Sequence, residues 1–124
     1  MAELVALGSD RGNLRVELYD KLEAALRRIR YRDSADLFGE VDFEVVDRLS
    51  GRRSVIARYR ANKILVKASA AALPSPALEY LVAHELAHIV TRKHTRTFRN
   101  VLETLYPNFE AGKLALQEFK AKLQ

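Results

Sequence analysis

Apolar residues recur every three or four positions early in the chain, which predicts an amphipathic helix over residues 13–30. Residues 41–46 then alternate between apolar and polar side chains, and residues 55–59 repeat this alternation. Because Ser50-Gly51 between the two segments is a turn signal, we expect them to pair as a hairpin. A third short strand is expected over residues 63–68.

The second half of the chain has a helical pattern. Ser75 is the expected N-cap of a helix, with Pro76 at its first position. The polar residues 91–93 offer an end for this helix, and a further helix is expected over residues 95–106. Its core-facing stripe consists of Phe98, Val101, Leu102 and Leu105. The order of elements predicts an α+β fold with an N-terminal helix, a small, mostly antiparallel sheet, and C-terminal helices.

Composition narrows the class of protein. The chain has 124 residues, which predicts a single domain over residues 1–124, and 48% of them are hydrophobic and 30% charged. The absence of cysteine excludes disulfides, thiolate nucleophiles and iron–sulfur clusters. No apolar run approaches the roughly 18 residues of a membrane span, and no targeting segment is evident, so a cytoplasmic protein is expected.

Charge is distributed unevenly around a net value of +5. Residues 33–47 contain six acids and no base, whereas residues 48–67 contain seven bases and no acid. One interpretation is a pair of neighbouring strands with complementary solvent faces. The other is a binding surface for nucleic acid or an acidic substrate. In that case the candidate nucleic-acid contacts are Arg52, Arg53, Arg58 and Arg60.

Residues 84–88 read His-Glu-Leu-Ala-His, the pattern H-E-x-x-H within a helical stretch. Side chains four residues apart lie on one helix face, so His84 and His88 can reach a single tetrahedral zinc ion. Glu85 is rotated by roughly 100 degrees from His84 and is better placed to act on a water molecule beside the metal. The spacing therefore predicts both the ligands and the general base.

A catalytic zinc usually has three protein ligands, so a third must come from elsewhere. In an unbroken helix His94 would lie about 9 Å beyond His88, on a different face. A helix end at residues 91–93 would allow His94 to fold back, and we expect it to be the third ligand. Glu103 is the competing candidate.

The motif H-E-L-A-H, a third histidine six residues later, Phe98 and the aromatic segment 105–109 together resemble the YgjP-like metallopeptidases, which have a zincin fold. The resemblance covers roughly residues 58–119. It implies zinc ligation by His84, His88 and His94, and Glu85 as catalytic acid and base. Wss1-like and SprT-like proteases, which act on proteins crosslinked to DNA, share the H-E-x-x-H core. The segment 58–62 departs from the family pattern, and substrate choice cannot be carried over.

We therefore expect a zinc-dependent metallopeptidase that holds one Zn²⁺ and acts on peptides or proteins. In its mechanism Glu85 would take a proton from the attacking water and return it to the leaving amine. Candidate donors to the oxyanion or substrate are Tyr80, Arg96, Arg99 and Tyr106. Residues 64–67 would either pair with a substrate as an edge strand or lie inside the sheet. The alternatives are a DNA-associated protease that uses the basic stretch 48–67, or a non-catalytic, metal-stabilised interaction module.

Overall fold

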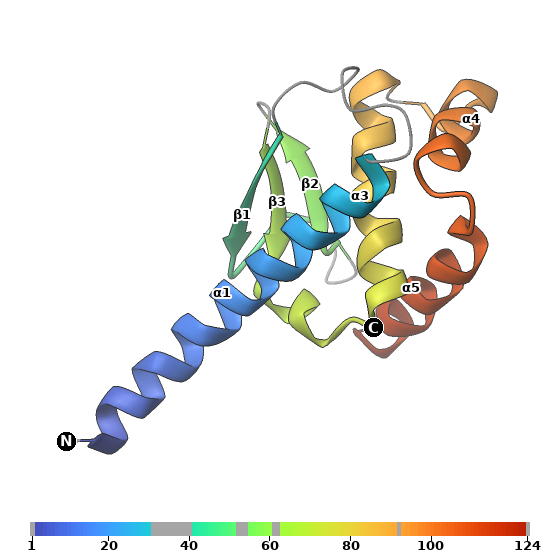
Figure 1. Ribbon diagram of the computed structural model, residues 1–124. Coiled ribbons are helices and arrows are strands. Elements are labelled where there is room, and N and C mark those ends of the chain that lie inside the picture. The colour runs from blue at the N-terminus through green and yellow to red at the C-terminus, as the bar shows by residue number, and fades with distance from the viewer. Residues whose placement is uncertain (1, 31–40, 52–54, 61–62, 92, 124) are drawn as a thin grey trace.

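The structure is a computed structural model (Figure 1). It describes residues 2–30, 41–51, 55–60, 63–91 and 93–123, with the backbone alone for residues 2–14, 30 and 123. The predicted nucleic-acid contacts Arg52 and Arg53 lie outside these residues, and so does the part of the acidic segment that covers residues 33–40.

Helix α1 (Ala2–Arg30) runs along the sheet, and its N-terminal end projects away from the rest of the molecule (Figure 1). The predicted apolar stripe is confirmed from Leu18 onward, because Leu18, Leu22 and Ala25 are fully buried. The predicted start at residue 13 is wrong, since the helix already begins at Ala2. Extending an existing helix is far less costly than nucleating one, so Gly8 and Gly12 do not stop it.

Three strands form a mixed sheet: β1 (Asp42–Val46), β2 (Ala57–Arg60) and β3 (Lys63–Lys67). Their order is β1-β3-β2, with β1 parallel and β2 antiparallel to β3. The predicted hairpin between the first two strands and the mostly antiparallel sheet are therefore wrong. Alternation along a strand predicts which face is buried but not which strand lies beside it. Pairing with β3 aligns buried Phe43 with buried Ile64.

Strand β3 is the central strand, and its Ile64 and Val66 are fully buried. The interpretation of residues 64–67 as a substrate-binding edge is wrong, and the interior interpretation is confirmed. In the described part of the sheet, β2 is an outer strand, and it contacts α3. The complementary-face interpretation of the charges holds in one place, where Lys63 on β3 pairs with Glu44 on β1 at 3.5 Å.

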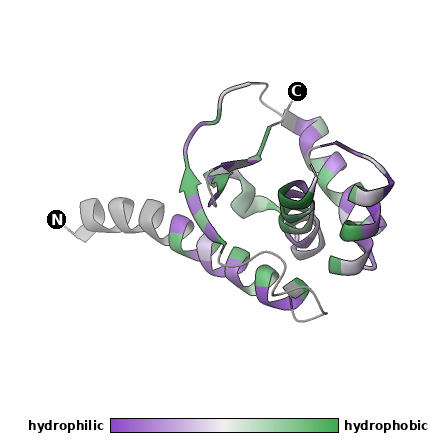
Figure 2. Cartoon of the chain, turned by 90° about the horizontal axis from the view of Figure 1, so that it is seen from above, coloured by the Kyte–Doolittle hydropathy of each residue, from purple (hydrophilic) through white to green (hydrophobic). Residues whose placement is uncertain are grey.

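Helix α3 (Ser75–Val90) is the central helix of the fold and follows the short 3₁₀ helix η1 (Ala68–Ala72). It is seen end-on in the middle of Figure 2, and it contacts α1, β2, α4 (Arg96–Leu105) and α5 (Phe109–Leu123). Ser75 is its first residue rather than its N-cap, which is Pro74, and no side chain caps this end. None of the helices in the described residues is long and apolar enough to cross a membrane.

Helix α5 lies very close to the start of α3 because Gly112 faces it. A Cβ atom at this position would lie 2.5 Å from the Pro76 carbonyl oxygen and 2.8 Å from the Tyr80 Cβ. Both distances are shorter than van der Waals contact, so only glycine fits. This contact fixes α5 beside the face of α3 that carries the histidines.

Candidate metal centre

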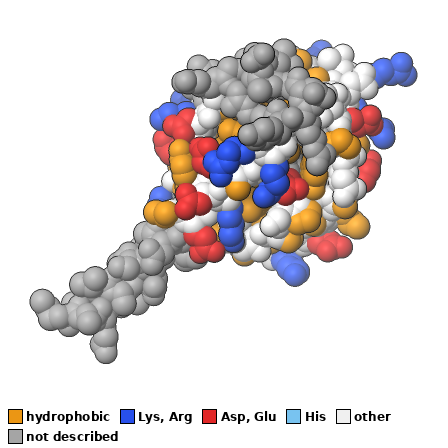
Figure 3. Space-filling model, viewed as in Figure 1, with side chains coloured by type: hydrophobic (Ala, Val, Ile, Leu, Met, Phe, Trp, Pro, Cys, Tyr) orange, Lys and Arg blue, Asp and Glu red, His pale blue; other side chains and the backbone are white. Residues whose placement is uncertain are grey.

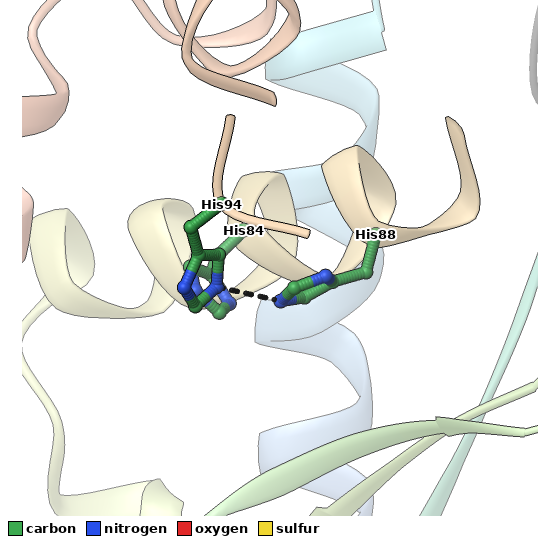
Figure 4. A group of neighbouring side chains, drawn as sticks. All are labelled: His84, His88 and His94. Atoms are coloured by element: carbon green, nitrogen blue, oxygen red, sulfur yellow. Dashed lines mark hydrogen bonds between the residues drawn. The ribbon is translucent and has the colours of Figure 1, made fainter. Parts of the chain in front are cut away.

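The three histidines meet at the end of α3 (Figure 4). His84 and His88 project from one face of the helix, which ends at Val90 as the polar stretch predicted. The chain then turns back and brings His94 over them, so that one ring nitrogen from each lies within 4.8 Å of the other two. The Nε2 atoms of His88 and His94 are 3.1 Å apart.

The turn that returns His94 is held by backbone and side-chain hydrogen bonds. The amide of Thr91 donates to the Ala87 carbonyl at 3.1 Å and closes α3. Thr95 is the N-cap of α4, and its hydroxyl accepts a hydrogen bond from the Phe98 amide at 3.4 Å. His94 is therefore fixed between two helix ends without a glycine in the turn.

Phe98 packs against all three imidazoles. Its ring centroid lies 5.2 Å from that of His84 and 4.7 Å from those of both His88 and His94. The sequence analysis placed Phe98 in the core stripe of α4, where it is indeed buried. Its contact with every histidine follows from the return of the chain and limits the rotation of the three rings.

The protonation of His88 suits metal binding. Burial lowers the pKa of His88, and positive charge on the neighbouring His84 lowers it further. The neutral imidazole is the form that binds metals. Its Nδ1 donates to the Thr91 carbonyl at 3.3 Å, which leaves Nε2 facing His94.

Glu85 lies beside this cluster rather than in it. It is the one charged side chain that is buried among those the structure describes, and its Oε2 atom is 3.2 Å from the Nδ1 of His84. Glu85 lines two cavities next to β2, and His94 lines neither of them. A carboxylate held here can exchange protons with a molecule in either cavity.

Three cavities adjoin the histidines and Glu85. The first, of about 630 Å³, lies between α3, α4 and α5 and is lined by His84 and His94. The second, of about 250 Å³, lies between the start of β2, α3 and α5. The third, of about 880 Å³, lies between β2 and the end of α3 and is lined by His88. His84 and Glu85 each belong to two of these linings, so the cavities converge on the site.

Of the other predicted site residues, some line a cavity and others do not. Tyr80, Arg96 and Arg99 line the first cavity. Tyr106 is buried, with its hydroxyl 3.5 Å from the Pro76 carbonyl oxygen, and lies outside these linings. Glu103 lies outside the histidine cluster and pairs with Arg99 at 3.2 Å.

Two arginines of the basic stretch border the third cavity. Arg58 donates to the Ser50 hydroxyl at 2.7 Å and to its carbonyl at 2.9 Å, and it lines the third cavity together with Arg60. Sequence reasoning missed Lys113, Gln117 and Lys120 of α5, which line the second cavity. Their spacing of four and three residues indicated a shared helix face, but not that this face borders the site.

The family model for the YgjP-like, metallopeptidase domain matches residues 56–119, more than half of the chain. The chain belongs to the YgjP-like metallopeptidase domain family. A comparison with curated proteins finds no match. Among solved structures, this YgjP-like chain is similar to the metallopeptidase zymogen abylysin of Pyrococcus abyssi. The two share 25% sequence identity and a TM-score of 0.60, over 85% of this chain and 93% of the other. The fold is therefore the α+β fold of a zincin-like metallopeptidase.

Proposed function

We propose that this metallopeptidase uses one zinc ion held by His84, His88 and His94, with Glu85 as general base and acid. The observation that carries the proposal is the convergence of three imidazole nitrogens within 4.8 Å, beside the buried carboxylate of Glu85, in a member of a metallopeptidase family. A buried carboxylate next to the candidate metal ligands favours catalysis over a non-catalytic interaction module, because such groups are concentrated at functional sites.

The donor set fits zinc. Two nitrogens bound at about 2.0–2.1 Å to one tetrahedral zinc ion lie about 3.3 Å apart. The 3.1 Å between the Nε2 atoms of His88 and His94 is close to this value. Three neutral nitrogen ligands with an open fourth position are typical of a catalytic rather than a structural zinc site.

When bound, zinc polarises a carbonyl group and makes water acidic near neutral pH. The carboxylate of Glu85 accepts the proton of the attacking water and then delivers it to the nitrogen of the leaving amine. Glu85 is only 7% exposed and lines two of the cavities, so a molecule bound there is within its reach. His84, hydrogen-bonded to Glu85 through Nδ1, orients the carboxylate toward the shared cavities.

Tyr80 is the best placed of the four candidate oxyanion donors. It lies one turn before His84, with ring centroids 5.6 Å apart, and it lines both the first and the second cavity. Burial raises the pKa of Tyr80, and the charge of Glu110 raises it further, so the hydroxyl keeps its proton and can donate it in a hydrogen bond. Arg99 is already paired with Glu103.

The substrate backbone has a place along β2. This outer strand borders the third cavity, opposite Glu85 and His88 at the end of α3. An extended peptide in that cavity would bring its carbonyl groups past the histidines, and backbone pairing with β2 would hold its direction. In this proposal β2 takes the role that the sequence analysis considered for residues 64–67.

The decisive experiment compares zinc-loaded wild-type protein with Glu85→Gln on an unfolded protein substrate. Both proteins are expected to bind one zinc ion, while hydrolysis by Glu85→Gln falls by a factor of about 10²–10⁴. Glu79→Gln serves as the matched control, because Glu79 is on the same helix and pairs with Arg28 away from the cavities. Equal hydrolysis by wild type and Glu85→Gln would overturn the proposal.

A further inference from the structure

The three cavities around the histidines are lined by many more cations than acids. The acids are Glu85, which has its own role, and Glu110, which lies 3.9 Å from Arg99. The cations come from three different elements: Arg58, Arg60, Arg96, Arg99, Lys113 and Lys120. By contrast, cations and acids are mixed over the face that carries α1 (Figure 3).

Several of these cations form no ion pair with another described residue. Arg58 is bound to Ser50, and Arg99 is paired with Glu103. In the part of the chain that the structure describes, no ion pair is formed by Arg60, Arg96, Lys113 or Lys120. Their positive charge is therefore available to a molecule in the cavities. Because the cavities converge on the histidines, the electrostatic potentials of these cations add there and attract an anion.

Helix α5 provides the two lysines that line the second cavity. Lys113 and Lys120 lie on one face of α5, with Gln117 between them. Lys113 lines both the first and the second cavity, which meet at Tyr80 and His84. The lining of the second cavity also includes the apolar residues Val55, Ile56 and Leu116. A lining that combines apolar side chains with two lysines fits a side chain with methylene groups and a terminal carboxylate.

We propose that the substrate is an acidic peptide, and that Lys113 and Lys120 bind a glutamate or aspartate side chain next to the bond that is cleaved. The proposal rests on the proposed peptidase function and adds the substrate class to it. The carboxylate enters the second cavity, directly beside His84 and Glu85. Arg96 in the first cavity and Arg60 in the third extend the preference for acidic residues beyond the second cavity.

A nucleic acid would be the other polyanion, but the first and second cavities lack what single strands use for binding. Such proteins stack bases on exposed aromatic rings. Here Tyr80 and Phe109 are only 7% exposed and Phe98 is 6% exposed.

The test uses zinc-loaded Glu85→Gln protein, so that binding is measured without turnover, and three short labelled peptides that differ only in carrying Glu, Gln or Lys at the same positions. Fluorescence anisotropy is expected to show the Glu peptide binding about tenfold more tightly than the Gln peptide. The Lys peptide should bind most weakly. The preference should shrink as salt is added.

Added Lys113→Gln or Lys120→Gln substitutions should each weaken binding of the Glu peptide by about two- to fivefold and leave the Gln peptide unaffected. Lys113→Arg keeps the charge and should restore the preference. Lys122→Gln is the matched control, because Lys122 lies on the same helix, is exposed, and lines none of the three cavities. Circular dichroism of each variant checks its folding.

Each outcome decides the proposal. Equal binding of the Glu and Gln peptides, no binding of either, or an equal effect of Lys122→Gln and Lys113→Gln would overturn it. Tighter binding of single-stranded DNA than of the Glu peptide would assign the cations to nucleic acid instead. If wild-type protein binds the Glu peptide but hydrolyses none of the three, the peptidase function fails and the binding preference stands. Equal kcat/KM on all three peptides would leave the peptidase function and remove the preference.

Discussion

The Nε2 atoms of His88 and His94 lie 3.1 Å apart, although α3 ends between these two residues. The contact depends on the extended residue Thr91 and on the Thr95 cap, which together start α4 back over α3. A third ligand from a continuous helix would require a different spacing, because residues six apart lie on different faces. The helix break is thus what allows a group of three histidines within eleven residues.

Replacement of His94 should separate the two candidates for the third ligand. Loss of a residue that only hydrogen-bonds to a metal ligand typically weakens metal binding by about 10–100-fold. We expect His94→Ala to weaken zinc binding by more than this, because it removes a direct ligand. Glu103→Ala is the control and should leave zinc affinity unchanged, because Glu103 pairs with Arg99. Competition with a chromophoric chelator measures both. Loss of affinity only in Glu103→Ala would contradict the assignment of His94.

Gly112→Ala tests the close contact between α5 and α3. Helix propensity alone would stabilise the variant by about 1 kcal/mol. The Cβ atom would however meet the Pro76 carbonyl oxygen at 2.5 Å, so we expect the free energy of unfolding to fall by about 1–3 kcal/mol. Urea denaturation measures the change. Ala111→Gly, at an exposed position of the same helix, calibrates the propensity effect, and a stabilised Gly112→Ala would show that the helices are not this close.

Tyr80→Phe tests the proposed oxyanion donor. Removing one such donor typically lowers kcat by about 10²–10³-fold, and we expect a decrease at the lower end of this range with little change in KM. Tyr106→Phe is the matched control, because its hydroxyl faces the Pro76 carbonyl rather than a cavity. Steady-state kinetics on one peptide compares the two. An equal decrease in both variants would indicate a structural rather than a catalytic effect.

The pKa of Tyr19 tests the contact of α1 with β1. The hydrogen bond from its hydroxyl to Asp42 Oδ1, 3.1 Å long, raises the pKa of Tyr19 from 10.0 to about 12, with a contribution from the charge of Glu23. A raised pKa favours the protonated form in the fold, so this contact stabilises the protein below pH 10.0 and is lost as the pH rises toward 12. Ultraviolet titration of tyrosinate should show that Tyr19 ionises at higher pH than an ordinary tyrosine, and Asp42→Asn should lower the pKa of Tyr19.

The sequence predicted the elements better than their pairing. The stripe of α4 is correct because Phe98, Leu102 and Leu105 recur at helical spacing and are buried in the structure. The alternation over residues 41–46 correctly predicts strand β1, but it does not predict the strand with which β1 pairs. Phe43 needs an apolar neighbour on its face, and both β2 and β3 can supply one, so the local pattern contains no information that favours β3.

The candidate site divides in the same way. His84, Glu85 and His88 follow from spacing along one helix, and His94 from a polar helix end. Lys113 could not be found, because its place beside His84 depends on how closely α5 approaches α3. That approach is decided by the missing side chain of Gly112, a contact between residues far apart in the sequence.

The strand order also has a kinetic consequence. Strands β2 and β3 are neighbours in the chain and pair antiparallel, so they can associate at a small loss of chain entropy, whereas β1 must join β3 from the far side across a longer loop. We expect β2, β3 and α3 to associate early during folding and β1 to dock late. Phe43→Ala in β1 should therefore accelerate unfolding and leave the folding rate nearly unchanged, which stopped-flow kinetics can measure.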